Sequence, residues 1–114
     1  MKSSLSDKIR LQHIHDAILE IVSYTKNISF EEFKSNSMTL FASVKQLEII
    51  GEAASNITEH FKKIYNEIEW RTIIGLRNLL VHEYFGIDEE IVWGIIKKDV
   101  PKLQKEVKQI LEQI

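Results

Sequence analysis

The chain has 114 residues, of which 44% are hydrophobic and 28% are charged, with one proline and four glycines. This composition fits a single folded domain spanning residues 1–114 and leaves no room for a second. Cysteine is absent, which excludes a disulfide framework, a cysteine-ligated zinc site and thiol catalysis. The net charge of −2 argues against a protein that coats nucleic acid non-specifically, but it allows one that binds a few phosphates locally.

The N-terminal segment turns polar at once and has no apolar stretch of the kind that forms a signal peptide. No window approaches the roughly 18 consecutive apolar residues of a membrane span. We therefore expect a cytoplasmic protein. Seven lysines could supply a phosphate-binding patch, although a solvated helix surface is the simpler interpretation. They are Lys62, Lys63, Lys97, Lys98, Lys102, Lys105 and Lys108.

The first predicted helix lies near the N-terminus, where apolar residues recur at steps of three and four. Its stripe consists of Leu11, Ile14, Ala17, Ile18, Ile21 and Val22. Ser4, with Asp7 three residues later, predicts a capping box at the start of this helix. A polar break follows, after which Ser29 is expected to cap a short helical turn.

A second long helix is predicted from a similar apolar stripe in the middle of the chain. The stripe consists of Leu40, Phe41, Val44, Leu47, Ile50, Ala54 and Ile57. Gly51 lies inside this helix, where glycine costs about 1 kcal/mol relative to alanine. Its presence therefore suggests that another backbone packs closely there. Thr58 is expected to cap a brief amphipathic helix that follows.

A third long helix is expected within residues 69–85, with Gly86 suited to a left-handed C-cap. Asp88 can cap the final helix, whose apolar positions run from Ile91 to Ile114. Pro101 lies inside this last run and should kink the helix or split it in two. The sequence contains no convincing alternating strand pattern. We therefore predict an all-α protein, a four- to five-helix up-and-down bundle.

Arg77 is the most unusual residue of the third helix. At about 100° per residue, several apolar side chains fall within about 60° of it, which places a permanent charge in the middle of an apolar stripe. A buried guanidinium is costly unless it is paired. Either a carboxylate pairs with it, Glu52 of the preceding long helix being the first choice, or the stripe lines a cleft that admits an anion.

Asn78 and His82 are spaced i, i+4 and share a second stripe of the same helix. On a straight helix Arg77 and His82 lie about 140° apart, so one helix presents them poorly to a single phosphate. Two solutions exist. The helix ends or bends near His82, or a second copy of the chain completes the site, which would require a two-fold homodimer.

These residue types suit the cleavage of RNA without a metal. A histidine can transfer protons near neutral pH, and an arginine offers a fixed positive fork for phosphate oxygens. We accordingly expect no cofactor and no metal site. Spacing alone makes a weak case, because His82 could cap a helix end and Tyr84 could be a core aromatic residue with a solvated hydroxyl.

The segment resembles the signature of the HepT-like branch of the HEPN superfamily. Arg77, Asn78 and His82 match the pattern of an arginine, a polar residue, three variable residues and a histidine, and Tyr84 completes the longer HepT-like form. The flanking segments are also similar. They are residues 47–53, Trp70, residues 85–88 and Trp93, and the resemblance covers roughly residues 5 to 112.

The resemblance implies a HEPN-type helical domain that forms two-fold dimers with a cleft at the interface. It implies a metal-independent ribonuclease toxin with Arg77 and His82 as the catalytic pair and with Asn78 in support. It also implies a neighbouring antitoxin, a minimal nucleotidyltransferase of the MntA type that transfers AMP from ATP onto Tyr84. Such bulky anionic groups would occupy the space and charge that RNA phosphates need. Lys45 departs from the family, which often has an arginine there.

Two other functions stay open at this point. The chain could be a non-catalytic subunit that presents substrate to a nucleotidyltransferase, or could act as its antitoxin. It could also be a helical dimer in which Arg77 and His82 are purely structural. Only the toxin interpretation predicts growth arrest and loss of RNA when the protein is expressed by induction.

Overall fold

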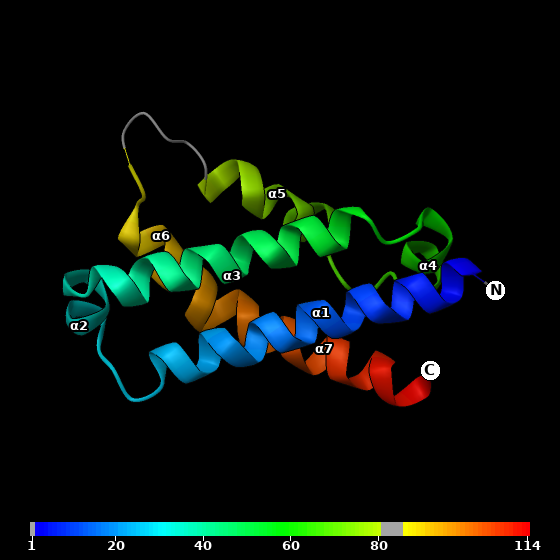
Figure 1. Ribbon diagram of the computed structural model, residues 1–114, viewed down its shortest axis with the longest axis horizontal. Helices are drawn as coiled ribbons and strands as arrows, with labels where there is room; N and C mark the ends of the chain where they lie inside the picture. Colours follow the sequence, from blue (N-terminus) through cyan, green and yellow to red (C-terminus); the bar gives the residue numbers. More distant parts are fainter. Residues whose placement is uncertain (1, 81–85) are drawn as a thin grey trace.

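The long helices of the chain run up and down along one axis (Figure 1). The computed structural model describes the backbone of residues 2–80 and 86–114, and the side chains of residues 5–77 and 86–114. Within these ranges it has no β-strand. Its elements are α1 (Lys2–Thr25), α2 (Phe30–Ser35), α3 (Ser37–Ser55), α4 (Glu59–Ile64), α5 (Trp70–Leu80), α6 (Glu89–Gly94), the π-helical segment η2 (Ile95–Asp99) and α7 (Val100–Gln113).

Helices α1, α3, α5 and the α6–η2–α7 run alternate in direction, and both termini lie at the same end of the molecule (Figure 1). Helix α3 packs against α1 on one side and α5 on the other, while α7 packs against α1. The short helices α2 and α4 close the two ends. The predicted all-α up-and-down bundle is confirmed. No helix within the described ranges combines the length and apolar character that a bilayer crossing requires.

The core follows the apolar stripes of the long helices. Leu11, Ile14 and Ile18 of α1 and Leu47 and Ile50 of α3 are completely buried. Burying each such side chain contributes roughly 1.5–3 kcal/mol, so the α1–α3 pair is held mainly by its apolar contacts. This pairing fixes α3 as the central helix on which the rest of the site is built.

Three predicted helix caps are confirmed. Ser29 accepts a hydrogen bond from the backbone N–H of Glu32, whose side chain accepts one from the Ser29 N–H. The side chain of Thr58 accepts from the N–H of Phe61, and that of Asp88 accepts at the start of α6. These side chains satisfy backbone donors that have no partner within the helix.

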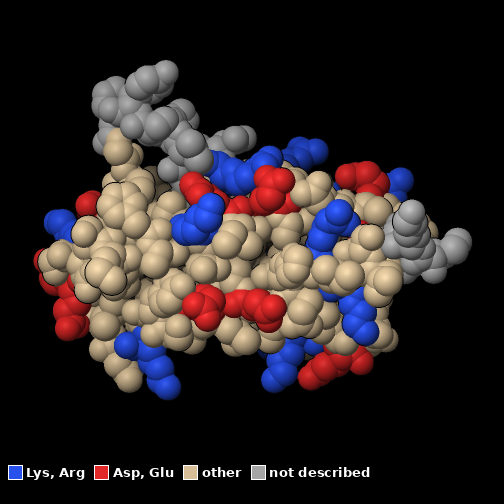
Figure 2. Space-filling view, viewed as in Figure 1, with Lys and Arg blue, Asp and Glu red and all other residues tan. Residues whose placement is uncertain are grey.

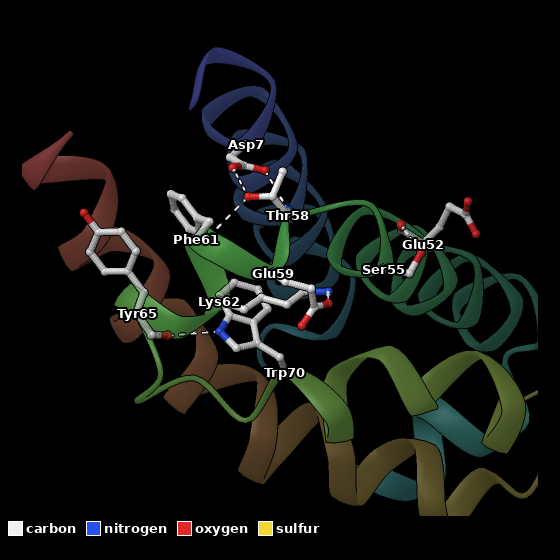
Figure 3. Close-up of polar contacts among 9 residues, drawn as sticks. All are labelled: Asp7, Glu52, Ser55, Thr58, Glu59, Phe61, Lys62, Tyr65 and Trp70. Carbon is white, nitrogen blue, oxygen red and sulfur yellow. Dashed lines mark hydrogen bonds and ion pairs between the residues drawn. The ribbon is translucent and has the colours of Figure 1, made fainter. Parts of the chain in front are cut away.

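The predicted capping box of Ser4 and Asp7 is wrong. Helix α1 begins at Lys2, so Ser4 lies inside the helix rather than at its N-cap. The Asp7 carboxylate instead accepts hydrogen bonds from the Thr58 N–H at 2.9 Å and from the Thr58 hydroxyl at 2.7 Å (Figure 3). Because Asp7 is 2% exposed, this contact ties the start of α1 to the start of α4 in a nearly dry environment.

Pro101 interrupts the last helix, as predicted. It lies in the first turn of α7, directly after η2, where the Val100 N–H donates to the carbonyl of Ile95 five residues earlier. Proline has no N–H and its ring crowds the carbonyl four residues before it, so the regular helical ladder cannot continue through this point. A π-helical turn absorbs the mismatch.

Four residues assigned to apolar stripes are not part of the core. Val22, Phe41, Ile91 and Ile114 are all exposed. Each stripe predicted from periodicity was wider than the strip of helix surface that a neighbouring helix covers. Helical periodicity gives the direction of the buried face, but the packing partner decides how wide that face is.

Candidate functional site

Arg77 lies where α5 packs closely against Gly51 of α3. A Cβ atom added to Gly51 would lie 2.9 Å from the Arg77 Cγ and 3.3 Å from the carbonyl oxygen of Ile73. Ordinary side chains do not fit at such distances, so the mid-helix glycine lets the two backbones approach. The close approach predicted from Gly51 is confirmed, and the residue it admits is the arginine of the motif.

The Arg77 guanidinium donates a hydrogen bond to Oε1 of Glu52, which confirms the predicted pairing. The second carboxylate oxygen of Glu52 accepts from the Asn56 side chain at 3.2 Å. The Arg77 side chain is 40% exposed and that of Glu52 is 60% exposed. The ion pair therefore fixes the direction of the guanidinium and still leaves donors open to solvent.

The helix periodicity placed Arg77 in the middle of an apolar stripe, but its side chain is 40% exposed rather than buried. Among the residues of α5 whose side chains are described, Trp70–Arg77, the buried ones are Trp70, Ile73 and Leu76, each 7% exposed. Arg77 borders that face, on the side that meets α3. Its burial cost is correspondingly modest, because solvent reaches the guanidinium directly.

An open groove of about 680 Å³ lies beside this ion pair. One wall is a stripe of α1 whose members are spaced three and four residues apart: Ser6, Ile9, Arg10 and His13. The other wall is a stripe of α3 and its C-cap residue Asn56: Lys45, Glu48, Ile49, Glu52, Ala53 and Asn56. Arg77 of α5 completes the lining, so the motif arginine faces a hollow rather than the core.

The groove has charges of both signs. It contains three permanent cations, Arg10, Lys45 and Arg77, and two carboxylates, Glu48 and Glu52. On the face seen in Figure 2, basic and acidic side chains lie together over α3 and α5 rather than forming a continuous basic band. This pattern suits recognition of a few phosphates and not broad electrostatic coating.

Arg10 and His13 line the groove but were not predicted as site residues. None of the seven lysines considered for a phosphate-binding patch lines it, which agrees with their simpler interpretation as solvated helix surface. Lys62 pairs with Glu59, and Lys97 lies over the Trp93 ring, and neither lysine lines the groove. The signal for Arg10 was its i, i+3 step to His13 on a face of α1 that also carries the exposed Ile9. That signal has meaning only once α3 is known to lie alongside.

Part of the predicted site lies outside the described residues. The backbone of Asn78 belongs to α5, but its side chain, and the whole of His82 and Tyr84, fall outside the described ranges. Gly86 has a φ of +83°, the left-handed conformation expected of it, although the helix end it was predicted to cap is not described.

The two tryptophans noted beside the motif hold helices in place, but only Trp70 belongs to a helix that lines the groove. The Trp70 indole donates to the Tyr65 carbonyl at 3.0 Å, which anchors the start of α5 to the end of α4 (Figure 3). Trp93 of α6 packs on Phe33 of α2, with ring centroids 4.9 Å apart. Both residues position helices, and neither lines the groove.

Comparison with known proteins gives consistent results. The model of the family described as Ribonuclease HepT-like matches residues 14–110. The chain is 42% identical to "Putative RNase MJ1380" of Methanocaldococcus jannaschii over 88% of this chain and 92% of that protein. It is also 42% identical to "Probable ribonuclease HepT" of Thermococcus cleftensis, over 87% and 90% of the two chains. No solved structure matches the chain significantly. The chain therefore belongs to the HepT-like ribonuclease family, whose class of activity is the cleavage of RNA.

Proposed function

We propose that the chain is the toxin of a HEPN–nucleotidyltransferase toxin–antitoxin pair and cleaves RNA without a metal, with Arg77 and His82 as its catalytic residues. One observation carries the proposal. The motif arginine is held by Glu52, is 40% exposed and lines an open groove, so its charge is aimed at solvent and can meet a phosphate.

The proposed chemistry follows from the residue types. The RNA 2′-oxygen attacks the adjacent phosphorus while the bond from phosphorus to the 5′-oxygen breaks, giving a 2′,3′-cyclic phosphate and a 5′-hydroxyl. The 2′-hydroxyl loses a proton and the leaving oxygen gains one, and His82 is the residue suited to transfer protons at neutral pH. Arg77 stabilises the additional negative charge on the phosphate oxygens in the transition state. Asn78 supports the site from the same helix.

We further propose a two-fold homodimer with the composite cleft between the two copies. Support comes from helix geometry, because Arg77 and His82 lie about 140° apart on a straight helix. A second copy facing the first can bring the arginine of one chain toward the histidine of the other. The exposed position of Arg77 is compatible with this arrangement, since the guanidinium is reachable from outside the protomer.

Regulation is proposed to act on Tyr84. An MntA-type nucleotidyltransferase would transfer AMP from ATP to the Tyr84 hydroxyl, releasing pyrophosphate. On an ideal helix Tyr84 lies about 20° from the line of Arg77. An anionic AMP group there would compete with RNA phosphates for the same guanidinium. Mass spectrometry after coexpression with the transferase should find AMP on Tyr84, and modification solely at another residue would contradict this part of the proposal.

The direct test measures RNA cleavage by the purified protein and by two variants. Arg77→Ala and His82→Ala should each lower kcat by about 10²-fold or more, because each removes a group that acts in the transition state. Arg71→Ala is the matched control, since Arg71 lies exposed on the same helix and outside the groove. It should retain normal activity. Wild-type protein that leaves RNA intact and is harmless when expressed alone would support the non-catalytic alternative instead.

A further inference from the structure

The groove extends well beyond Arg77, and most of its lining has no role in the proposed cleavage step. On α3 it runs from Lys45 to Asn56, which corresponds to a length on the order of 15 Å along the helix. On α1 it runs from Ser6 to His13, about 10 Å. The groove is therefore longer than a single phosphate needs, and it extends beyond the motif arginine.

Two cations in the groove differ from Arg77 in their surroundings. Among the residues whose side chains the structure describes, neither Arg10 nor Lys45 has a carboxylate oxygen within ion-pair distance. Arg77, by contrast, is paired with Glu52. Arg10 of α1 and Lys45 of α3 both line the groove, so both charges are accessible to an occupant of it.

The floor of the groove between these cations is apolar. Ile9, which is 48% exposed, and the half-buried Ile49 contribute aliphatic surface from the two walls, and Ala53 leaves space between them. The exposed imidazole of His13 adds a flat polar surface that can stack or donate a hydrogen bond. A strip of apolar surface flanked by cations is the combination that binds unpaired nucleotides, whose bases need contact area and whose phosphates need charge.

We propose that this α1–α3 groove binds a single-stranded RNA segment next to the cleaved phosphate, with Arg10 and Lys45 contacting its backbone and a base resting over Ile9 and Ile49. The proposal rests on the ribonuclease function proposed above and extends it to substrate binding. A groove of about 680 Å³ suits one or two nucleotides and is too small for a duplex. Arg10 and Lys45 are thus binding residues, whereas Arg77 acts on the reacting phosphate.

Glu48 is a negatively charged residue of the groove, so its removal should affect RNA binding in the opposite direction from removal of a cation. It lies on the same wall as Lys45, one helical turn later, and no cation within the described side chains pairs with it. A carboxylate there repels an RNA phosphate, so its charge weakens the binding of RNA in the groove. Removing the Glu48 charge should strengthen RNA binding, whereas removing the Arg10 or Lys45 charge should weaken it.

Binding is measured by fluorescence anisotropy with a labelled 10-nucleotide single-stranded RNA, in a His82→Ala background that prevents cleavage. Arg10→Ala and Lys45→Ala should each raise Kd about 5- to 10-fold at low salt. Each should also reduce the slope of log K against log salt by about 0.7, the value for one phosphate contact on a single strand. Glu48→Gln should lower Kd. Lys63→Ala, which removes an exposed lysine of α4 outside the groove, is the matched control and should change neither quantity.

Cleavage kinetics separate this proposal from the proposed ribonuclease function. In the chain with His82 intact, Arg10→Ala and Lys45→Ala should lower kcat/KM for the 10-nucleotide RNA but not for a dinucleotide, which spans only the cleaved bond. If the unsubstituted protein cuts neither substrate, the ribonuclease function fails while the anisotropy data still judge the groove. If it cuts both and the two variants behave like Lys63→Ala, the groove proposal is overturned and the ribonuclease function stands.

A loss of self-association in these variants, seen by light scattering without a change in the anisotropy of bound RNA, would identify the groove as a contact between copies and would also overturn the proposal.

Discussion

Asp7 and Glu52 both make contacts between helices, and they do so in opposite surroundings. Asp7 is 2% exposed and uses both oxygens to accept hydrogen bonds from Thr58. The Glu52 side chain is 60% exposed and uses one oxygen for Arg77 and the other for Asn56. The first contact is closed to solvent and satisfied within the fold. The second orients a cation beside a groove and leaves the cation with donors to spare.

This difference separates stability from function. When a buried carboxylate loses its partners, or the partners lose the carboxylate, the groups left behind are buried without a hydrogen bond. The free energy of unfolding then falls by the full desolvation cost of those groups. An exposed ion pair contributes little to stability because water solvates both charges when they part. We therefore expect substitutions at Asp7 to change the free energy of unfolding and substitutions at Glu52 to change the rate of RNA cleavage.

The largest effect on stability is expected for Asp7→Ala. It leaves the Thr58 N–H and hydroxyl without their acceptor in a buried site, which should cost about 3 kcal/mol and lower Tm by roughly 10 °C. Asp16→Ala, the same change at an exposed position of α1, should shift Tm by no more than about 2 °C. Thermal unfolding followed by circular dichroism checks both. Equal shifts for the two variants would show that the buried contact of Asp7 contributes no more to stability than an exposed carboxylate.

Gly51→Ala tests the contact that places Arg77. The added Cβ meets the Arg77 Cγ and the Ile73 carbonyl, so overpacking of about 1–3 kcal/mol opposes a gain of about 1 kcal/mol in helix propensity. We expect a net loss of up to about 2 kcal/mol and a fall in RNA cleavage of about 10-fold, because the guanidinium is displaced. At Gly75 of α5 an added Cβ meets no described atom within 4 Å, so Gly75→Ala should instead stabilise the fold by about 1 kcal/mol. Denaturant unfolding gives the change in the free energy of unfolding, and cleavage assays on the same samples give the change in rate.

Glu52→Gln should separate the stability of the fold from the rate of RNA cleavage. The amide keeps the size of the side chain and loses its charge, so stability should change by less than about 1 kcal/mol. RNA cleavage should fall about 10-fold, because Arg77 is no longer held in one direction. Glu59→Gln removes an exposed carboxylate from another ion pair, with Lys62 at 3.5 Å, and should leave cleavage unchanged. Unaltered activity in Glu52→Gln would mean that Arg77 needs no partner to be positioned.

The smallest effect is expected for Glu106 of α7. Burial raises the pKa of the Glu106 carboxyl, Lys102 opposes the rise, and Glu67 and Glu69 add to it. A raised pKa in the folded state means that ionised Glu106 weakens the fold at neutral pH, whereas below about pH 4 the group is protonated in both states and the penalty disappears. Glu106→Gln should therefore raise Tm by less than about 2 °C at pH 7 and not at all in acid. Glu112→Gln, at an exposed position of the same helix, serves as the control.

Local features of the fold could be predicted from the sequence because their causes are local. Ser29, Thr58 and Asp88 cap the helices they precede, and Pro101 breaks the ladder in its own helix. Each effect acts within about one helical turn, through a single hydrogen bond or ring. The capping prediction failed where a local rule met a distant competitor, since Asp7 binds Thr58, which is 51 residues away in the sequence.

By itself, the sequence determined the helical class, the close approach at Gly51, the pairing of Glu52 with Arg77 and the motif that marks the family. Only the tertiary structure decided that Arg77 borders the buried face of α5, and that Arg10 of α1 and Lys45 of α3 line the same groove. The physical reason is that periodicity specifies the direction of a side chain around its own helix. It does not specify which other helix lies there, how much of the face that helix covers, or what hollow is left between them.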